Sequence, residues 1–212
     1  MHYVPPVDNG LELIYSDESL LVANKPTGLL SVPGRGADKQ DCLSARIQRD
    51  FPDALVVHRL DMATSGLMIF ARGLQMQRRL SELFRDRFVT KRYVAVVAGT
   101  VQAATGEVNL PIAADWPNRP LRRIDAKTGK PSLTRYRVLA QHADTTRVEL
   151  TPVTGRTHQL RVHMAAIGHP ILGDALYGDP ASAPRLLLHA LSLDLPHPSG
   201  NSPLNFECPP SF

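Results

Sequence analysis

One stretch of the chain places charged and small residues between two apolar runs. The sequence HRLDMATSG occupies residues 58–66, with VV directly before it and LMIF directly after it. Apolar runs of this kind are typical of the buried ends of strands. Asp61 therefore lies at the edge of a core, where a carboxylate is costly unless it is paired or hydrogen-bonded. Thr64 and Ser65 can supply such hydrogen bonds, and Gly66 permits a tight backbone path.

These residues alone leave two interpretations of Asp61. In a strand–turn–strand, Asp61 and Thr64 are ordinary turn residues. In a catalytic loop, Asp61 is an acid that is held ionised by the polar groups around it. His58 and Arg59 lie three and two residues before it, so the stretch carries charge of both signs.

An arginine-rich face is expected on one helix. Residues 74–88 have apolar side chains at helical spacing, at positions 76, 80, 83, 84 and 88. The opposite face carries Arg78, Arg79, Arg85 and Arg87. Such a face suits either solvent or phosphate contact. Arg78 and Arg79 fit a solvated face. Arg85 and Arg87 lie nearer the segment KRYVAVVAG at residues 91–99, and for these two RNA contact is favoured.

A long insert at residues 113–131 combines aromatic and basic side chains. Its members are Trp116, Arg119, Arg122, Arg123, Lys127 and Lys130. Stacking and phosphate charge act together in nucleic-acid-binding loops, so this insert is expected to contact RNA. A plain surface hairpin is the alternative, although loops of this length in a compact domain are usually functional.

Motifs for metals and common cofactors are missing from the sequence. There is no Walker loop, no G-x-G-x-x-G after a strand and no C-x-x-C pair. His158, His163 and His169 lie close together, but their spacing is not that of a helical metal pair and no nearby carboxylate completes a site. We therefore expect neither a metal nor a cofactor.

Bulk composition points to a globular protein. The 212 residues are 43% hydrophobic and 21% charged, enough for one large core. No apolar run approaches the ~20 residues of a membrane span, and the N-terminus does not resemble a signal peptide. Cys42 and Cys208 form no paired motif, so free thiols in a reducing cytoplasm are expected. The net charge of +4 is compatible with a polyanionic partner.

The pattern of apolar residues predicts an α+β fold with a mixed, largely antiparallel sheet. Strands are expected at 11–15, 20–25, 67–72, 91–99, 133–140, 147–153, 191–198 and 204–209, and the first two form a hairpin. Helices are expected at 41–50, 74–88 and 157–168, with Asp41 and Thr157 as caps of the first and last. Residues 1–10 are expected to form a flexible leader before a single domain at 11–212.

Five segments resemble motifs of the RluA-type pseudouridine synthases. HRLDMATSGL is similar to their HRLD-x-x-TSGL motif. The others are NKPTGLLSVPGR at 24–35, KRYVAVVAG at 91–99, GRTHQLRVHMAAIGHPILGD at 155–174 and RLLLHALSL at 185–193. Because all five occur in the family order, the resemblance covers nearly the whole chain. It implies the pseudouridine synthase fold, a twisted central sheet with helices and loops around a cleft, without the additional S4 domain of some relatives.

The resemblance implies that Asp61 is the catalytic carboxylate at C1′ of a uridine. The base is detached from C1′ and rejoined through C5, either by covalent attack at C1′ or through a glycal. Arg161 is implied as the cation that keeps the acid ionised. Tyr93 is implied to stack on the base and to take part in removing the C5 proton.

The resemblance also implies RNA contacts. The target uridine must be flipped out, with Arg59 placed to fill the space. Further contacts are expected from His58, Thr64, Arg85, Arg87, Lys91, Trp116, Arg119, Arg122, Arg123, Arg156 and His158. Leu187 and Leu188 are expected to line a uracil pocket, although both also fit a core. The segments DWPNRP and TGKP make the chain similar to family members that modify both 23S rRNA and a tRNA anticodon stem-loop.

Three other functions remain open. A family member that modifies a single rRNA or tRNA site shares the same motifs. An RNA N-glycosidase also cleaves at C1′, but it usually needs a second carboxylate to activate water. A non-catalytic RNA-binding module would explain the basic insert but not the HRLD motif. A cytoplasmic monomer with RNA as its partner and no membrane association is expected.

Overall fold

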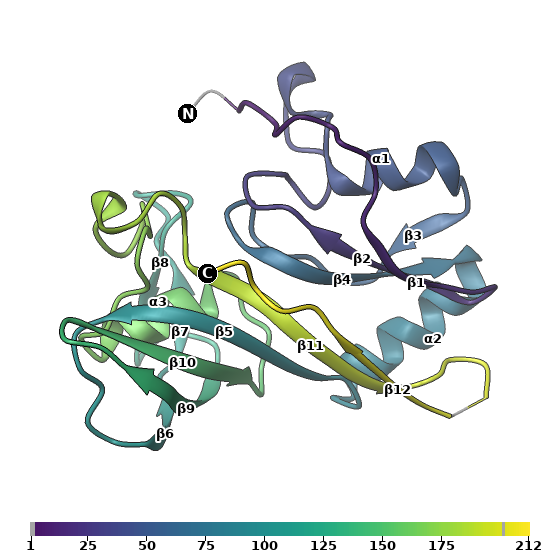
Figure 1. Ribbon diagram of the computed structural model, residues 1–212. Helices are drawn as coiled ribbons and strands as arrows, with labels where there is room; N and C mark the ends of the chain where they lie inside the picture. The colour runs from purple at the N-terminus through teal and green to yellow at the C-terminus, as the bar shows by residue number, and fades with distance from the viewer. Residues whose placement is uncertain (1–2, 201) are drawn as a thin grey trace. The chain divides into compact units, whose positions relative to one another are not determined.

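The computed structural model describes residues 3–200 and 202–212, and the chain forms two compact units. The first unit runs to Lys91 and takes in Ala190–Ser211, and the second comprises Arg92–His189 with Phe212. Helices and mainly antiparallel strands occur together, so the α+β prediction is confirmed (Figure 1). No helix in the described part of the chain is long and apolar enough to cross a membrane.

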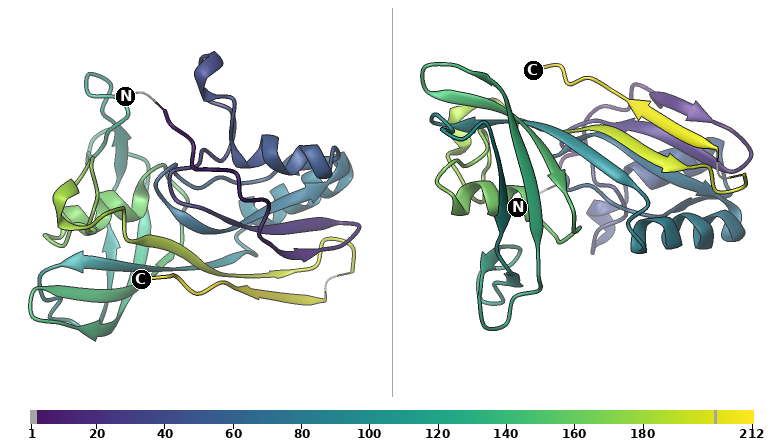
Figure 2. Two further views of the ribbon diagram at one scale, coloured as in Figure 1. Left: turned by 45° about the horizontal axis from the view of Figure 1, so that its top comes forward. Right: turned by 90° about the horizontal axis from the view of Figure 1, so that it is seen from below.

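The first unit contains a sheet in which β1, β2, β4 and β11 are neighbours. Strand β3 pairs with β4, and β12 pairs with β11 in the antiparallel hairpin drawn in yellow in Figure 2. The strands are β1 (Leu13–Ser16), β2 (Leu20–Lys25), β3 (Ala54–Val56), β4 (Ser65–Arg72), β11 (Leu188–Pro196) and β12 (Pro203–Glu207). The predicted hairpin of the first two strands is confirmed.

Strands β2 and β4 are buried on both faces, which explains why they are apolar runs rather than alternating strands. On one face, Leu20, Val22, Leu67, Ile69 and Ala71 pack in a cluster that includes Leu80 of α2 (Gly73–Arg85). On the other face, Leu21, Ala23, Met68 and Phe70 pack with Leu43 and Ile47 of α1 (Leu43–Asp50). Figure 1 shows the two helices on opposite sides of these strands. Each fully buried large apolar side chain contributes about 1.5–3 kcal/mol to the stability of the folded state. This three-layer packing therefore fixes the start of β4.

Helix α1 begins later than predicted and has a different cap. It starts at Leu43, and Cys42 is the N-cap, with Sγ accepting a hydrogen bond from the Ala45 amide at 3.4 Å. The Asp41 carboxylate is used elsewhere, because it accepts hydrogen bonds from Arg46 at 2.8 and 2.7 Å. Asp41 as the cap was therefore wrong. Cys42 and Cys208 form no disulfide, as the sequence predicted, and both are buried.

Helix α2 ends at Arg85 rather than at residue 88. Arg87 adopts a left-handed conformation, with φ of 64°, which no α-helix can continue. Phe88 follows it and is 63% exposed, so its assignment to the apolar stripe was wrong. Leu80 is the buried residue of the helix, with Met76, Leu83 and Phe84 packed beside it.

The second unit is built on four strands in the order β5, β10, β9, β6. They are β5 (Thr90–Ala98), β6 (Thr105–Asn109), β9 (Leu133–Gln141) and β10 (Thr145–Pro152). All the neighbouring pairs are antiparallel. The insert after β6 contains regular structure, because β7 (Ile112–Ala114) and β8 (Arg122–Ile124) form a separate antiparallel hairpin.

Helix α3 (Gln159–Ala166) is two residues shorter at its start than predicted. His158 is its N-cap residue and has φ of 57° in the left-handed region, so Thr157 as the cap was wrong. The Gln159 side chain explains the late start, since its Oε1 accepts hydrogen bonds from Thr154 Oγ1 and the Arg156 amide. Gly168 ends the segment with φ of 86°, as expected for a residue just after a helix.

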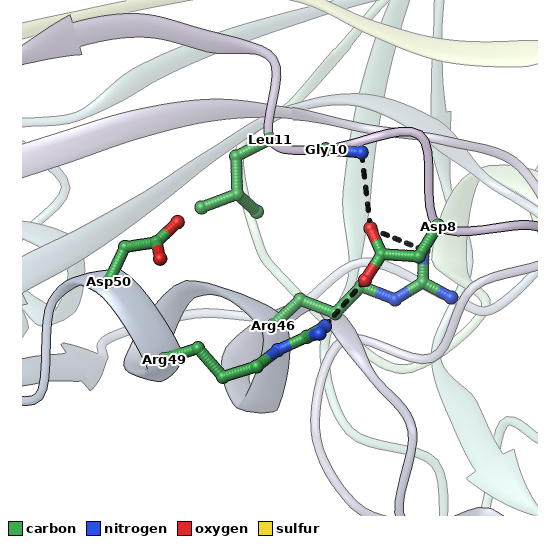
Figure 3. A pocket seen from close by; sticks show the side chains of 6 residues that line it. All are labelled: Asp8, Gly10, Leu11, Arg46, Arg49 and Asp50. Atoms are coloured by element: carbon green, nitrogen blue, oxygen red, sulfur yellow. Dashed lines mark hydrogen bonds and ion pairs between the residues drawn. The ribbon is translucent and has the colours of Figure 1, made fainter.

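The N-terminal segment contacts α1. Residues 1–2 of the predicted leader lie outside the described residues. The Tyr3 hydroxyl donates to the Asp41 carbonyl at 2.9 Å. Asp8 Oδ2 accepts from Arg49 at 2.6 Å, and Asp8 Oδ1 lies 3.6 Å from Arg46 (Figure 3). These contacts border a surface pocket of about 300 Å³ lined by Asp8, Gly10, Leu11, Arg46, Arg49 and Asp50.

Candidate active site

Asp61 lies in the loop of residues 57–64 between β3 and β4. Asp61 is half-buried, and its main-chain carbonyl accepts a hydrogen bond from the Thr64 amide at 3.1 Å. This turn brings Asp61, Arg59 and Thr64 together on one short segment. Arg59 is exposed, whereas Thr64 is buried.

A buried lysine holds the Asp61 loop in place. Lys25 ends β2 and is 0% exposed. Its Nζ donates to the carbonyls of Pro26, Leu29 and Met62 at 2.8, 2.7 and 3.0 Å. A buried ammonium is tolerated only when its donors are used, so the three carbonyls fix both the lysine and the residue after Asp61. The sequence analysis missed Lys25, although a lysine ending the apolar run LLVAN was a usable signal.

The segment of residues 27–31 reinforces this attachment. The Gly28 amide donates a hydrogen bond to the Met62 carbonyl at 2.9 Å. The hydroxyls of Thr27 and Ser31 donate to the carbonyls of Ala63 and Leu60, each at 2.7 Å. The Leu60 amide also donates back to Ser31 Oγ at 3.1 Å. All of these bonds involve main-chain atoms of the loop. The loop main chain is therefore fixed on both sides of Asp61.

Gly66 closes the loop in a conformation that requires glycine. Its φ is 110°, and a Cβ on it would overlap the backbone of Ala190. This close approach explains the glycine that the sequence analysis associated with a tight backbone path.

His58 has a structural role at the start of the loop. Its Nε2 accepts a hydrogen bond from the Ile69 amide at 2.9 Å, and its ring stacks on Phe84 of α2 with centroids 4.6 Å apart. Burial, together with the charge of Lys91, lowers the pKa of His58 to about 3. The ring is therefore neutral at pH 7 and connects the loop to β4 and α2.

Arg161 is held in α3 by a buried ion pair. Its Nε and Nη2 donate to the two carboxylate oxygens of Asp174 at 2.8 and 2.7 Å. The arginine is 5% exposed and the aspartate 0%. Burial acts to raise the pKa of Asp174, but the hydrogen bonds and charge of Arg161 and the Leu176 and Tyr177 amides outweigh it, and the pKa is lowered. The sequence analysis missed both Asp174 and Tyr177.

Tyr93 lies on β5, half-buried, where it is opposite Leu150 of β10. Lys91 is near the start of the same strand, and burial lowers the pKa of its ammonium. Leu188 is buried, which fits its interpretation as a core residue. Leu187 is half-buried, and its main chain bonds to Val96 and Leu172.

The β7–β8 hairpin brings several predicted RNA contacts together. Trp116 is 67% exposed, and the Arg119 guanidinium lies 3.6 Å from the centre of its ring. Arg123 pairs with Asp125 at 3.0 Å. Hydrogen bonds from the Thr128 amide and hydroxyl, from Arg123 and from the Lys127 amide hold the pKa of Asp125 well below its ordinary value. The hairpin thus offers an aromatic surface with fixed positive charge beside it.

The remaining predicted residues lie at the edges of elements. Arg85, at the end of α2, pairs with Asp86 at 2.8 Å, and Arg87 is exposed. Arg156 is exposed and its Nε donates to the Pro131 carbonyl at 3.3 Å. None of the predicted residues lines the pocket in Figure 3. Among residues 3–200 and 202–212, no group of three or more His, Cys, Asp or Glu side chains could hold a metal.

Comparison with known proteins identifies the family. The model of the family described as RNA pseudouridylate synthase matches residues 19–166, which is more than half of the chain. The chain belongs to the RNA pseudouridylate synthase family. It is therefore an isomerase that converts uridine in RNA to pseudouridine, as the sequence predicted.

Similar members of the pseudouridylate synthase family cover all or nearly all of the chain. The dual-specificity RNA pseudouridine synthase RluA of Escherichia coli K12 is 50% identical over 215 residues, covering 100% of this chain and 98% of that protein. The RluA of Vibrio cholerae is 50% identical over 199 residues, 92% of this chain and 81% of its own. The solved human RNA Pseudouridylate Synthase Domain Containing 1 superposes with a TM-score of 0.81 at 30% identity, covering 99% of this chain and 87% of that one.

Proposed function

We propose that this pseudouridine synthase modifies specific uridines in two kinds of RNA, 23S rRNA and a tRNA anticodon stem-loop. Relatives named dual-specificity RNA pseudouridine synthase match the whole chain at 50% identity, which supports the proposal. The exposed Trp116 with Arg119 beside it also supports it, because such a pair can stack on the unpaired bases of RNA loops. The proposed enzyme is a cytoplasmic monomer that needs no cofactor and does not associate with a membrane.

In the proposed reaction, the N1–C1′ bond of uridine breaks, the uracil turns, and a C5–C1′ bond forms. C5 loses its proton and N1 takes one up, so no oxidant, reductant or second substrate is needed. Asp61 is the proposed acid at the sugar. Its carboxylate either bonds to C1′ or removes a sugar proton on the way to a glycal. Both routes require an ionised carboxylate fixed against a flipped-out uridine.

The observation that best supports the catalytic role of Asp61 is the fixed main chain around it. Lys25 and the segment of residues 27–31 bind the carbonyls of Leu60, Met62 and Ala63. A loop that is already fixed does not have to reorganise when the substrate binds, which favours catalysis. An ordinary surface turn would not need a fully buried ammonium beneath it.

Two further side chains have proposed catalytic roles. Arg161 is proposed to keep the Asp61 carboxylate ionised, as the family resemblance implies. Its paired, buried guanidinium has a defined orientation, which suits that role. Tyr93 is proposed to stack on the uracil and to assist removal of the C5 proton.

The proposed RNA contacts follow the predicted list. They are Arg59, Thr64, Arg85, Arg87, Lys91, Trp116, Arg119, Arg122, Arg123, Arg156 and His158, with the half-buried Leu187 at the uracil. Leu188 is buried and fits the core better than the uracil pocket. His58 contributes indirectly, because its ring is engaged by the Ile69 amide and Phe84. Since phosphate contacts dominate RNA affinity, binding should weaken with increasing salt.

The proposal is tested by mapping pseudouridine in two substrates, a 23S rRNA stem-loop and a tRNA anticodon stem-loop. The wild-type chain should modify one uridine in each, and Asp61→Asn should modify neither. The double variant Trp116→Ala/Arg119→Ala should weaken binding of both RNAs by about tenfold or more. A matched control is Arg135→Ala, which removes an exposed arginine of β9 that pairs with Glu107.

The possible outcomes separate the alternatives. Modification of only one RNA would replace dual specificity with a single-site function. Free uracil with an abasic RNA would indicate an N-glycosidase instead. Binding without any new product in either RNA would indicate an RNA-binding module.

A further inference from the structure

Tyr177 lies where three parts of the second unit meet. Its amide donates to Asp174 Oδ1 at 3.1 Å, and the Leu176 amide donates to the same oxygen at 2.9 Å. These bonds form a tight turn around a carboxylate that is itself buried. The turn therefore fixes the direction in which the Tyr177 side chain leaves the backbone.

The Tyr177 ring supports the arginine of α3. The Arg161 guanidinium carbon lies 5.2 Å from the centre of the ring. Asp174 binds the edge of the same guanidinium through two hydrogen bonds. An edge contact and a face contact together restrict both rotation and tilt of the planar group. Residues 174–177 thus determine how Arg161 is presented.

The Tyr177 hydroxyl joins the hairpin to the start of α3. It accepts a hydrogen bond from the Arg122 amide of β8 at 2.8 Å, and it lies 2.7 Å from His158 Nδ1. An amide can only donate, so the hydroxyl accepts from Arg122 and keeps its own proton and a second lone pair. When that proton is donated to Nδ1, neutral His158 carries its own proton on Nε2.

His158 and Arg122, which both contact the Tyr177 hydroxyl, each have an unusual feature. His158 adopts a left-handed backbone conformation that is uncommon for residues other than glycine, with φ of 57°. Arg122 Nε is the one buried side-chain nitrogen or oxygen in the described residues that has no hydrogen-bond partner. A buried donor of this kind needs an acceptor, and a phosphate oxygen of RNA can supply one only when the hairpin shifts to expose the nitrogen.

We propose that Tyr177 is a positioning residue that couples RNA binding at the β7–β8 hairpin to the orientation of Arg161. Its ring orients the guanidinium, and its hydroxyl holds the hairpin and presents His158 Nε2–H as a donor to RNA. This inference rests on the proposed roles of Arg161 and the hairpin. The proposed tautomer of His158 does not depend on those roles.

The first test is the tautomer of His158 in the RNA-free protein. Nitrogen-15 NMR at a pH of about 9, well above the ordinary histidine pKa, distinguishes the two neutral forms. Wild-type protein should show the Nε2–H form, and Tyr177→Phe should shift the His158 signals toward a mixture. A dominant Nδ1–H form in the wild type would overturn the proposal, even if the variant failed to fold.

The second test separates the hydroxyl from the ring in steady-state kinetics on an RNA stem-loop. Tyr177→Phe keeps the ring, so KM should rise by about tenfold while kcat stays within about threefold. Tyr177→Leu also loses the ring, and kcat should fall by a further factor of about ten or more. Tyr136→Phe, on β9 of the same unit, is the matched control and should leave both constants unchanged. Equal losses of kcat in both Tyr177 variants would overturn the division between ring and hydroxyl.

A double-mutant cycle in RNA binding tests the coupling itself. The loss caused by Trp116→Ala should be at least about threefold smaller in the Tyr177→Phe background than in the wild type. Fully additive losses would overturn the coupling. Failure of the proposed function appears elsewhere, as turnover that survives Asp61→Asn, so the two failures are distinguishable.

Discussion

The loop around Asp61 and the start of α3 around Arg161 are held by different means. The Asp61 loop is bound through its main chain, by Lys25 and by the segment of residues 27–31. Arg161 is bound through its side chain, by the carboxylate of Asp174 and the ring of Tyr177. The acid is half-buried, whereas the arginine is almost fully buried.

This difference suits the two proposed roles. Hydrogen bonds to carbonyls on both sides of a residue fix its Cα without neutralising its side-chain charge. A buried arginine, in contrast, is stable only if a carboxylate pairs with it. The group that holds Arg161 in place, the Asp174 carboxylate, therefore also offsets its charge. The acid should therefore tolerate changes in its own charge better than the arginine does, as far as folding is concerned.

Replacement of the arginine should give the largest combined loss. Arg161→Ala leaves the buried Asp174 carboxylate without its cation, which should lower the free energy of unfolding by about 3–5 kcal/mol. The rate of pseudouridine formation should fall by about 10³-fold, because the proposed stabilisation of Asp61 is also lost. Urea unfolding and single-turnover assays measure the two effects.

A double variant separates these two effects. Arg161→Met with Asp174→Leu removes both buried charges, so most of the stability should return. The rate should remain low. Recovery of the rate together with the stability would show that Arg161 has only a structural role.

Removal of the lysine beneath the Asp61 loop should have an intermediate effect. Lys25→Met keeps similar bulk but takes a donor from three carbonyls, which should cost about 2–4 kcal/mol of unfolding free energy. Because Met62 follows Asp61 directly, kcat should fall by about 10–100-fold with a smaller change in RNA affinity. Lys39→Met, which removes a partly exposed lysine 3.9 Å from Asp38, should change stability by less than about 0.5 kcal/mol. Unchanged kcat in Lys25→Met would refute the idea that the lysine positions the acid.

At neutral pH, His58 should contribute the smallest effect, because its contribution depends on pH and appears only as the pH falls. Its folded pKa is about 3, below the ordinary value of about 6.5. Between these values the unfolded chain binds one more proton, so its stability falls as pH falls, with a slope of at most about 1.4 kcal/mol per pH unit. His58→Asn should remove this slope in urea unfolding between about pH 3 and 6.5. Above pH 7, plots of unfolding free energy against pH should run parallel for the wild type and His58→Asn. If they also ran parallel below pH 6.5, the conclusion that His58 stays neutral in the folded protein would be contradicted.

Much of the fold could be predicted because apolar patterns report burial directly. The runs LLVAN and LMIF predicted β2 and β4, and these strands are buried on both faces. Helix starts were less predictable, because capping depends on which side chains are already engaged. Asp41 has the right chemistry for a cap, but Arg46 binds it and Cys42 caps α1 instead.

The candidate site was predictable only in part. HRLD and its neighbours locate Asp61 because they are contiguous in sequence. Lys25, Asp174 and Tyr177 act through contacts between separate segments, and such contacts leave no periodic signal. Phe88 shows the same limit, since an apolar residue at helical spacing is exposed once Arg87 ends the helix.

The central claim is that the Asp61 carboxylate acts on the sugar of the uridine. It is tested most directly by tritium release from RNA labelled at C5 of uridine, with Asp61→Asn compared with the wild type. The substitution is nearly isosteric, so RNA affinity should stay within about threefold. Tritium release should fall by at least about 10⁴-fold. Release within tenfold of the wild-type rate, from a folded variant that still binds RNA, would contradict the assignment.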